Sequence, residues 1–424
     1  MATGVSAQLA ALVGELHNRA FRRLWLSQVV SEFGDWAARL ALTTVVYRRT
    51  DSAAWAALIA VSSMLPMLGG GQLLASLADR VDRRIVMVVA DLVRAALFVV
   101  LAIATPPTPI LFALSVAAGL ATVPFEAARS AATLDVTPEE RIPAVMSLGQ
   151  ATQSVALIGG WSVGGGLLAL MGAHGALAVN AGTFVLSALL LVGLPALRPL
   201  ASPAASADRA GRAVSPDAAE SAIGRLAAAS RSILREPLVR RAGLLAVFAV
   251  GPATAVEALV VPYVGQTWSN HQSIAAVLLA LGAAGDLVVT VAIPTRFRPE
   301  RLLRIAALCA AAPAAVAILL LSSGSAALVG AGFVVSALSL AAIAPASAAL
   351  APRLPTHLRA SCFTVLATAL TLTQVVLSTG GGLAADAASC ADAARLLMWL
   401  PLAAGVGALA RPVIRRVRVA EQAA

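Results

Sequence analysis

The sequence predicts an all-α integral membrane protein with twelve transmembrane helices arranged as two parallel six-helix repeats. Of its 424 residues, 59% are hydrophobic and only 12% are charged, so polar side chains are too few to cover a soluble globule. Charged residues gather between apolar runs of roughly 18–25 residues, the length that crosses the hydrocarbon core of a bilayer. Similar landmarks recur half a chain apart, which indicates an internal duplication.

Twelve apolar runs are long enough to span a membrane. They cover residues 24–47, 53–77, 85–104, 108–128, 144–170, 175–195, 239–264, 271–294, 303–322, 325–350, 360–384 and 394–411. Most of the 31 basic residues fall in loops on the side of the two termini, whereas Arg48, Arg49 and Arg395 fall on the other side. The positive-inside rule therefore places both termini in the cytoplasm, and we expect a multi-pass protein of a bacterial cytoplasmic membrane.

The chain is expected to divide into three parts. An N-terminal six-helix bundle takes residues 1–198, and a C-terminal six-helix bundle with a short cytoplasmic tail takes residues 237–424. Between them, residues 199–236 mix Ser, Pro, Ala, Asp and Arg without a sustained apolar run. This composition predicts a cytoplasmic linker that is flexible at first and forms an amphipathic helix over 222–234.

The two bundles share landmarks at a constant spacing. Pro138 precedes the glycine run that starts at Gly164, and Pro355 precedes the glycine run that starts at Gly380 in the same way. The two prolines are 217 residues apart and the two glycines 216, about half the chain. Parallel repeats of this kind are expected of transporters whose halves rock about a central site.

The turn between the second and third predicted helices carries a known pattern. Residues 75–84 read Ala-Ser-Leu-Ala-Asp-Arg-Val-Asp-Arg-Arg, which resembles the major facilitator superfamily signature Gly-x-Leu-Ala-Asp-Arg-x-Gly-Arg-Arg, with Ala75 and Asp82 in place of its glycines. Further matches resemble the drug- and siderophore-exporting branch, which includes macrolide and enterobactin exporters: Gly34-Asp35, residues 91–95 and residues 128–131. The resemblance covers essentially the whole chain.

This resemblance implies a secondary transporter that exports an amphipathic small molecule, such as a drug, siderophore or natural product, by proton antiport, as in multidrug resistance. It also implies a latch in which Asp79 holds the two halves together in the outward-facing state through charge-assisted hydrogen bonds. The predicted latch residues are Asp79, Arg80, Arg83, Arg84, Asp91, Arg94 and Arg129. Residues 160–165 lack the proline of the Gly-Pro-x-x-Gly-Gly pattern of antiporters, which leaves the transport direction open.

The first predicted helix carries a polar stripe. Gln28, Glu32, Asp35, Arg39 and Thr43 recur at spacings of four, three, four and four, which places them on one narrow face. Ionisable groups in the membrane interior are functional candidates by default. We therefore predict that Asp35 and Glu32 couple protons while the other three line a cavity; the structural alternative is an ion pair between Asp35 and Arg39.

Other helices add candidates of the same kind. Gln150, Gln153 and Trp161 share one side of the fifth predicted helix and are predicted to line the cavity. Glu257 in the seventh helix and Asp286 in the eighth are further proton-coupling candidates. Glu257 has an alternative role as the partner of Arg39 across the cavity.

The sequence also disfavours several other classes of protein. No Lys-Ser or Lys-Thr follows a glycine run, and no His-Glu-x-x-His occurs, so neither an ATP pump nor a membrane-embedded enzyme is indicated. The three cysteines lack metal-site spacing, and we expect no metal and no cofactor. The expected partners are a small-molecule substrate, protons and the lipid bilayer. We expect no nucleic-acid partner, and we expect the protein to be a monomer. The alternatives are a proton-linked importer, a lipid-moving carrier or a non-transporting membrane sensor.

Overall fold

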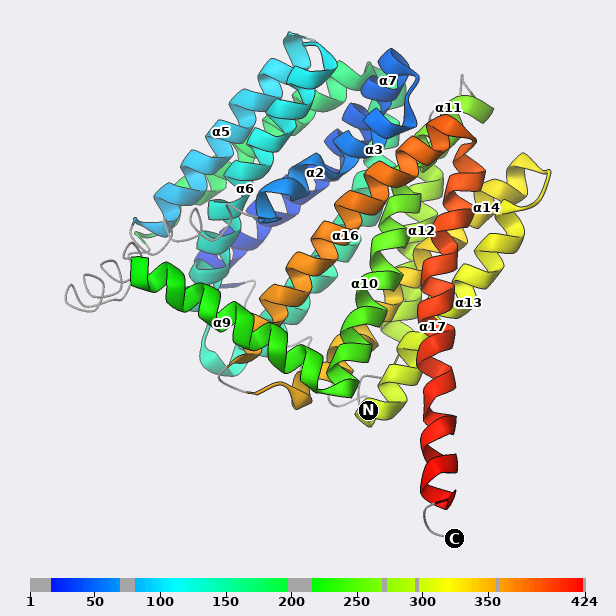
Figure 1. Cartoon of the computed structure of the whole chain (residues 1–424). Coiled ribbons are helices and arrows are strands. Elements are labelled where there is room, and N and C mark those ends of the chain that lie inside the picture. The colour runs from blue at the N-terminus through cyan, green and yellow to red at the C-terminus, as the bar shows by residue number, and fades with distance from the viewer. Residues whose placement is uncertain are drawn as a thin grey trace. The chain divides into compact units, whose positions relative to one another are not determined.

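The computed structural model describes residues 17–68, 81–104, 106–196, 216–268, 273–293, 297–355 and 358–421. Every regular element in these ranges is a helix (Figure 1). Within them, nine stretches are long and apolar enough to cross a membrane, in addition to the shorter apolar stretch Ala53–Leu68. The all-α membrane fold predicted from the sequence is therefore confirmed.

The helices follow the predicted spans closely. In chain order they are α2 (Arg19–Thr50), α3 (Ala53–Val61), η1 (Ser62–Leu68), α5 (Arg83–Ile103), α6 (Thr108–Val136), η3 (Glu139–Arg141), α7 (Ile142–Val192), α9 (Pro216–Arg235), α10 (Pro237–Ala258), α11 (Val260–Thr267), α12 (Ser273–Ala292), α13 (Pro299–Leu321), α14 (Ala326–Ala337), η4 (Leu338–Ala342), α15 (Ile343–Leu350), η5 (Ala351–Arg353), α16 (Arg359–Ala387) and α17 (Cys390–Glu421). The predicted helix 53–77 is described as far as residue 68, and the predicted amphipathic helix 222–234 lies within α9.

The polar stripe of the first helix does not prevent it from forming a long helix. α2 runs over 32 residues, or about 48 Å at ~1.5 Å per residue, which exceeds the ~30 Å hydrocarbon core. It is not among the nine stretches because Glu32, Asp35 and Arg39 lower the hydropathy of its centre. It nevertheless covers the whole of the predicted first span, 24–47.

Two predicted helices are joined without an intervening loop. The spans predicted at 144–170 and 175–195 form the continuous α7, whose direction changes at Gly172. Gly172 has φ of 69° and ψ of −178°, a conformation that a residue with a Cβ rarely adopts. One glycine therefore makes the turn for which the sequence predicted a short loop.

The chain divides into two compact units, each of which has most of its residue contacts within itself. The first contains residues 1–49, 62–206 and 271–280, and the second contains residues 50–61, 207–270 and 281–424. These units follow spatial contacts and do not test the boundaries 198 and 236 that the sequence predicts for the two bundles. Those boundaries stay a prediction.

In the first unit, α5 packs along both α6 and α7. Leu24 of α2, Met87 of α5, Phe125 of α6 and Leu191 of α7 are buried together in one apolar cluster. Between membrane helices such side chains stabilise the contact by van der Waals packing and not by removal from water. This cluster fixes the helices that carry the polar residues described below.

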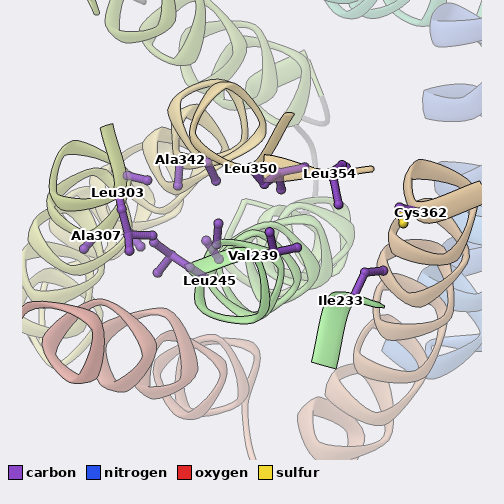
Figure 2. Packing of buried hydrophobic residues seen from close by; sticks show 14 of the residues in the cluster. Ile233, Val239, Leu245, Leu303, Ala307, Ala342, Leu350, Leu354 and Cys362 are labelled. Carbon is purple, nitrogen blue, oxygen red and sulfur yellow. The ribbon is translucent and has the colours of Figure 1, made fainter. Parts of the chain in front are cut away.

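In the second unit, small residues let the helices approach closely. Ala242 of α10, Ala307 of α13 and Ala342 of η4 are fully buried in one cluster with larger apolar residues (Figure 2). Small side chains favour such close packing in membrane helices. Ala229 and Ile233 place the apolar face of α9 against the same cluster.

A carboxylate of α16 caps the start of α3 within the second unit. Asp386 accepts hydrogen bonds from Ser52 Oγ at 2.6 Å and from the backbone nitrogens of Ala53 at 2.5 Å and Ala54 at 3.2 Å. These donors belong to the first turn of α3, where backbone N–H groups lack intrahelical partners and negative charge is favoured. Residues 50–61 are thus anchored to α16 through one side chain.

Replacing Asp386 by Ala is expected to lower the free energy of unfolding by about 0.5–2 kcal/mol, the usual cost of losing a helix cap. Thermal unfolding of the detergent-purified protein measures the loss as a lower Tm. Asp386→Asn keeps one oxygen acceptor, so its Tm should fall between those of the alanine variant and the wild type. An alanine variant with the wild-type Tm would show that the cap contributes nothing.

Candidate functional site

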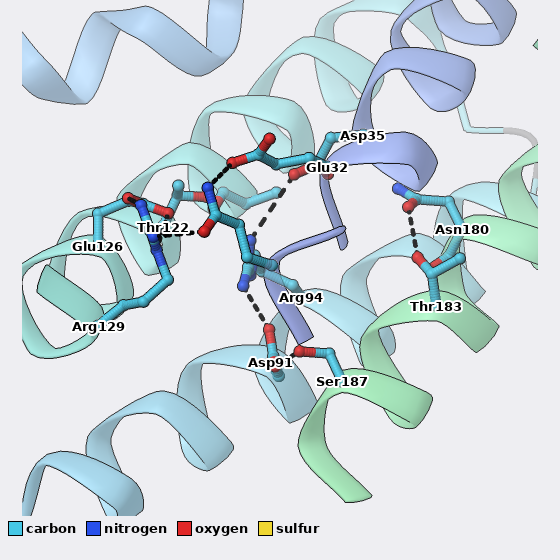
Figure 3. A network of polar contacts seen from close by, with 12 residues as sticks. Glu32, Asp35, Asp91, Arg94, Thr122, Glu126, Arg129, Asn180, Thr183 and Ser187 are labelled. Carbon is cyan, nitrogen blue, oxygen red and sulfur yellow. Dashed lines mark hydrogen bonds and ion pairs between the residues drawn. The ribbon is translucent and has the colours of Figure 1, made fainter. Parts of the chain in front are cut away.

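The centre of the polar region in the first unit is the buried guanidinium of Arg94 on α5. It forms an ion pair with Asp91 on the same helix and lies 3.8 Å from Oδ2 of Asp35 on α2 (Figure 3). Ser187 of α7 donates a hydrogen bond of 2.6 Å from Oγ to Oδ2 of Asp91. Two helices, α2 and α5, therefore bring a carboxylate each to one arginine, and α7 adds a hydroxyl to Asp91.

Arg94 is held by aromatic rings as well as by charge. Its Cζ lies 4.3 Å from the ring centroid of Phe125 and 4.3 Å from that of Phe184. A guanidinium over a ring face is attracted by about 0.5–2 kcal/mol. These contacts and the ion pair to Asp91 compensate in part for removing the cation from water.

The two carboxylates beside Arg94 differ in exposure. The side chain of Asp91 is 0% exposed and that of Arg94 2%, whereas the side chain of Asp35 is 43% exposed. Asp91 and Arg94 therefore form a closed pair, and Asp35 is the more exposed of the two carboxylates.

A second cluster lies along the same face of α2. Arg129 of α6 donates hydrogen bonds to both carboxylate oxygens of Glu126, at 3.3 and 2.6 Å, and to Oε1 of Gln28 at 2.8 Å. Gln28 in turn donates from Nε2 to Glu32 at 2.8 Å. The glutamine thus connects Glu32 to the Arg129–Glu126 pair, while Oε2 of Glu32 is buried and has no hydrogen-bond partner among the described residues.

Gly34 lets α2 approach α7 closely beside Asp35. A Cβ at this position would overlap Oδ1 of Asn180 and Oγ1 of Thr183. On α7, Thr183 donates a hydrogen bond of 3.0 Å from Oγ1 to Oδ1 of Asn180 (Figure 3). A larger residue at position 34 would push α2 away and move Asp35 with it.

A pocket of about 170 Å³ opens in the same unit. Its lining residues are Phe21, Leu24, Trp25, Gln28, Arg129, Ser130, Thr133, Val145, Met146, Gly149, Gln150 and Gln153. Three residues predicted from the sequence to line a cavity, Gln28, Gln150 and Gln153, lie here together. The pocket therefore adjoins the second cluster through Gln28 and Arg129.

The other three predicted lining residues lie elsewhere on the same helices. Trp161 of α7 packs on Trp36 of α2 with ring centroids 5.3 Å apart, and Cζ of Arg39 lies 5.1 Å from the Trp36 ring centroid. Thr43 donates from Oγ1 to the backbone oxygen of Arg39 at 2.8 Å. These residues are not part of the lining that the described residues give this pocket.

The predicted latch residues occupy different places. Asp79 and Arg80 lie outside the described residues. Arg83 forms an ion pair with Asp135 of α6, and Arg84 donates from Nη1 to the backbone oxygen of Leu194 at 3.0 Å. These two arginines tie the start of α5 to the ends of α6 and α7, whereas Asp91, Arg94 and Arg129 belong to the two polar clusters.

The second unit brings its two predicted acids together. Glu257 of α10 and Asp286 of α12 lie close enough for their charges to interact. Oδ1 of Asp286 is buried and lacks a hydrogen-bond partner among the described residues. Nearby on α10, Thr254 accepts a hydrogen bond of 3.1 Å at Oγ1 from Nε2 of Gln374.

Sequence reasoning missed the residues that surround Arg94. Phe125 and Phe184 look like ordinary core residues in the sequence, and nothing in their spacing indicates contact with a cation. Asn180 and Ser187 did carry a signal, because each is a polar residue inside an apolar span and both are fully buried. In the part of the chain that the structure describes, no group of three or more His, Cys, Asp or Glu is placed to hold a metal.

Comparison with known proteins identifies the relatives of this chain. The family model of the Major Facilitator Superfamily matches residues 24–413. An uncharacterized MFS-type transporter, YfiS of Bacillus subtilis (strain 168), is 29% identical over 180 residues, which are 42% of this chain and 43% of that protein. The alignment therefore spans less than half the length of this relative.

Solved transporter structures share the fold. A bacterial homologue of the human lysosomal transporter Spinster has a TM-score of 0.68 at 15% identity, over 92% of this chain and 95% of that one. The nucleoside transporter NupG has a TM-score of 0.68 at 11% identity, over 92% and 99% of the two chains. A POT family transporter in complex with 5-aminolevulinic acid has a TM-score of 0.67 at 12% identity, over 92% and 95%. At such low identity these structures show the fold alone.

Proposed function

This chain belongs to the major facilitator superfamily and is a membrane transporter of that type. We propose that it exports an amphipathic small molecule by proton antiport. The substrate is a drug, siderophore or natural product that leaves the cell while protons enter. Transport proceeds by alternating access, in which two repeats rock about a substrate site.

The geometry at Arg94 carries this proposal. One buried cation faces two carboxylates, and the buried Asp91 already forms the closed pair with it. Asp35 is the second carboxylate, 3.8 Å away and 43% exposed, so it is the acid that exchanges between the arginine and a proton. An ionisable group of this kind in a membrane interior is costly and therefore points to function.

Antiport requires that a bound proton weakens substrate binding and that bound substrate weakens proton binding. A ligand shifts an equilibrium only by its differential affinity for the two states. By linkage, the proton must weaken substrate binding by the same factor by which substrate weakens proton binding. We propose that Asp35 provides this linkage. Glu32 on the same helix, and Glu257 and Asp286 in the second unit, are the other proton-coupling candidates.

The topology of the proposal follows from the arginine distribution. We propose that both termini and the linker 199–236 are cytoplasmic, and that two six-helix bundles, 1–198 and 237–424, move about the substrate site. Asp79 and Arg80 then belong to a cytoplasmic latch. The pairing of Arg83 with Asp135 supports it by fixing the start of α5 beside that turn.

Transport in proteoliposomes tests the proposed function. A thermal-shift screen of the detergent-purified protein first identifies a substrate, because a ligand of the folded state raises apparent stability by mass action. Liposomes with an acidic interior should then accumulate this substrate, since outward proton flow drives uptake in an antiporter.

Three other results would contradict the proposal, and each favours a different alternative. Accumulation driven by an acidic exterior would indicate proton symport and hence an importer. Movement of a labelled lipid without solute exchange would indicate a lipid-moving carrier. A folded protein that exchanges none of the compounds it binds would indicate a non-transporting sensor.

A further inference from the structure

The pocket in the first unit is too small for a whole drug-sized molecule. Its volume is about 170 Å³. Sites for drug-sized ligands usually measure roughly 300–1,000 Å³. An engineered protein cavity of about 150 Å³ holds benzene. The pocket therefore matches a single ring with one small substituent, the size of one end of an amphipathic molecule.

One part of the pocket wall is apolar, and a hydrogen bond fixes the orientation of its Trp25 ring. Phe21, Leu24, Val145 and Met146 contribute apolar surface. Trp25 donates a hydrogen bond of 2.9 Å from Nε1 to Oγ1 of Thr152, which is 8% exposed. This bond holds the indole ring in place, so the pocket offers a rigid aromatic surface against which a flat ring packs well.

The polar part of the wall has groups available for a ligand. Gln150 and Gln153 are exposed in the pocket, and the amides of both lack a side-chain hydrogen bond among the described residues. Gln28 is already engaged at both Oε1 and Nε2, by Arg129 and Glu32. Thr133 donates to the backbone oxygen of Arg129 at 2.8 Å. Two amide groups therefore remain to bind an incoming polar substituent.

The lining, as far as the structure describes it, contains one charged group, which is already in an ion pair. Among the described residues that line the pocket, Arg129 is the only one with a charge. Its partner Glu126, and Glu32 beyond Gln28, do not belong to this lining. Arg129 gives three of its five N–H groups to Glu126 and Gln28, so two remain for a carbonyl or carboxylate in the pocket. A cation would meet this guanidinium at the wall, because the carboxylate that pairs with it is not part of the lining.

We propose that this pocket binds an aromatic ring carrying a carboxamide or carboxylate, and that it discriminates against rings carrying a cationic group. This inference rests on the proposed transport of an amphipathic small molecule and assigns the chemistry of one end of that substrate. Trp25 and the apolar residues hold the ring, and Gln150, Gln153 and Arg129 bind the substituent. The pocket therefore favours neutral and anionic aromatic substrates over cationic drugs.

Three probes of nearly equal size test this selectivity: benzoate, benzamide and benzamidinium. Binding to the full-length purified protein is measured by tryptophan fluorescence and checked by ligand-observed NMR. Benzoate and benzamide should bind with dissociation constants at least tenfold lower than that of benzamidinium. Trp25→Phe should remove the fluorescence change, which assigns the signal to this pocket. Equal or tighter binding of benzamidinium would overturn the proposal, as would the absence of binding by all three probes.

A pocket-filling variant locates the binding. A Cβ added at Gly149 meets no atom within 4 Å, so this position of the lining has room for a side chain, and Gly149→Leu is designed to fill the pocket. Gly182→Leu is the matched control, because Gly182 lies on the same helix with equally open space and does not belong to the pocket lining. Gly149→Leu should reduce benzamide affinity at least tenfold, and Gly182→Leu should leave it unchanged. Unchanged affinity in Gly149→Leu would contradict the assignment.

The same experiment separates this inference from the proposed function. Probe binding is measured at equilibrium and requires neither a proton gradient nor turnover. A wild-type protein that binds benzamide in a manner sensitive to Gly149→Leu but shows no proton-driven transport would support the pocket and contradict antiport. A protein that transports its substrate but binds none of the probes would support transport and overturn the pocket.

Discussion

Replacing Asp35 by Asn is expected to abolish uphill efflux while still allowing substrate to equilibrate down its gradient. Asparagine keeps the size of the side chain and one acceptor oxygen, replaces the other oxygen by an NH2 donor, and binds no proton in the physiological range. The variant therefore loses the group that exchanges between Arg94 and a proton. Substrate affinity should also lose most of its dependence on pH. Transport in proteoliposomes with and without a pH gradient measures both effects.

The acid in the second unit provides the control for this result. Glu257→Gln should retain uphill transport if Asp35 carries the proton. An Asp35→Asn protein that still concentrates substrate with an unchanged pH profile would reduce Asp35 to a packing residue. Glu257 would then be the leading candidate, together with Asp286 beside it.

Replacing Arg94 by Met should destabilise the protein more than any other single change considered. The guanidinium is 2% exposed and pairs with Asp91, which is 0% exposed. Without it, Asp91 keeps the hydrogen bond from Ser187 but loses its counter-charge. Breaking a buried ion pair by removing one partner costs about 3–5 kcal/mol. Thermal unfolding in detergent and the yield of folded protein measure the loss.

Two further variants make this prediction specific. The double variant Arg94→Met, Asp91→Asn removes both charges, so it should regain a large part of the lost stability. Arg395→Met removes the cation of an ion pair with Asp392 whose side chains are 39% and 47% exposed, and it should cost much less, since an exposed salt bridge is worth about 0–1 kcal/mol. An Arg94→Met protein with the wild-type Tm would show that the ion pair does not stabilise the fold.

The helices could be predicted from the sequence because apolar length is a local property. A run long enough to cross the bilayer must satisfy its backbone hydrogen bonds within itself, so a helix is the only simple solution. The sequence does not show where a helix ends when the backbone conformation of a single residue makes the turn. Gly172 turns the chain inside α7 without a loop, and only its backbone conformation reveals this.

The sequence predicts that the polar residues of α2 share one face, but it does not identify their partners on other helices. Sequence spacing reveals pairs on the same helix, such as Asp35 and Arg39, because residues four apart are neighbours. The structure instead places Arg94 of α5 beside Asp35. Partners from other helices depend on which helices pack together, and hydrophobicity does not specify that packing in a membrane.

For the glutamines, residue type alone predicts a polar environment but not the hydrogen-bond partners. Gln28 and Gln153 were assigned to a cavity because amides in membrane helices need polar partners or water, and both line the pocket. The role of Gln28 as the link between Arg129 and Glu32 was not predictable. It requires α6 to present Arg129 to α2, which is a tertiary contact.

Proton release on substrate binding tests the account most directly. Substrate is added to the purified protein in weakly buffered solution with a pH indicator, and the protons released are counted for the wild type and for Asp35→Asn. Linkage between proton and substrate at Asp35 predicts that the wild type releases protons on binding and that the variant, although it still binds substrate, releases almost none. Equal proton release by the two proteins would contradict the central claim that Asp35 exchanges its proton for substrate.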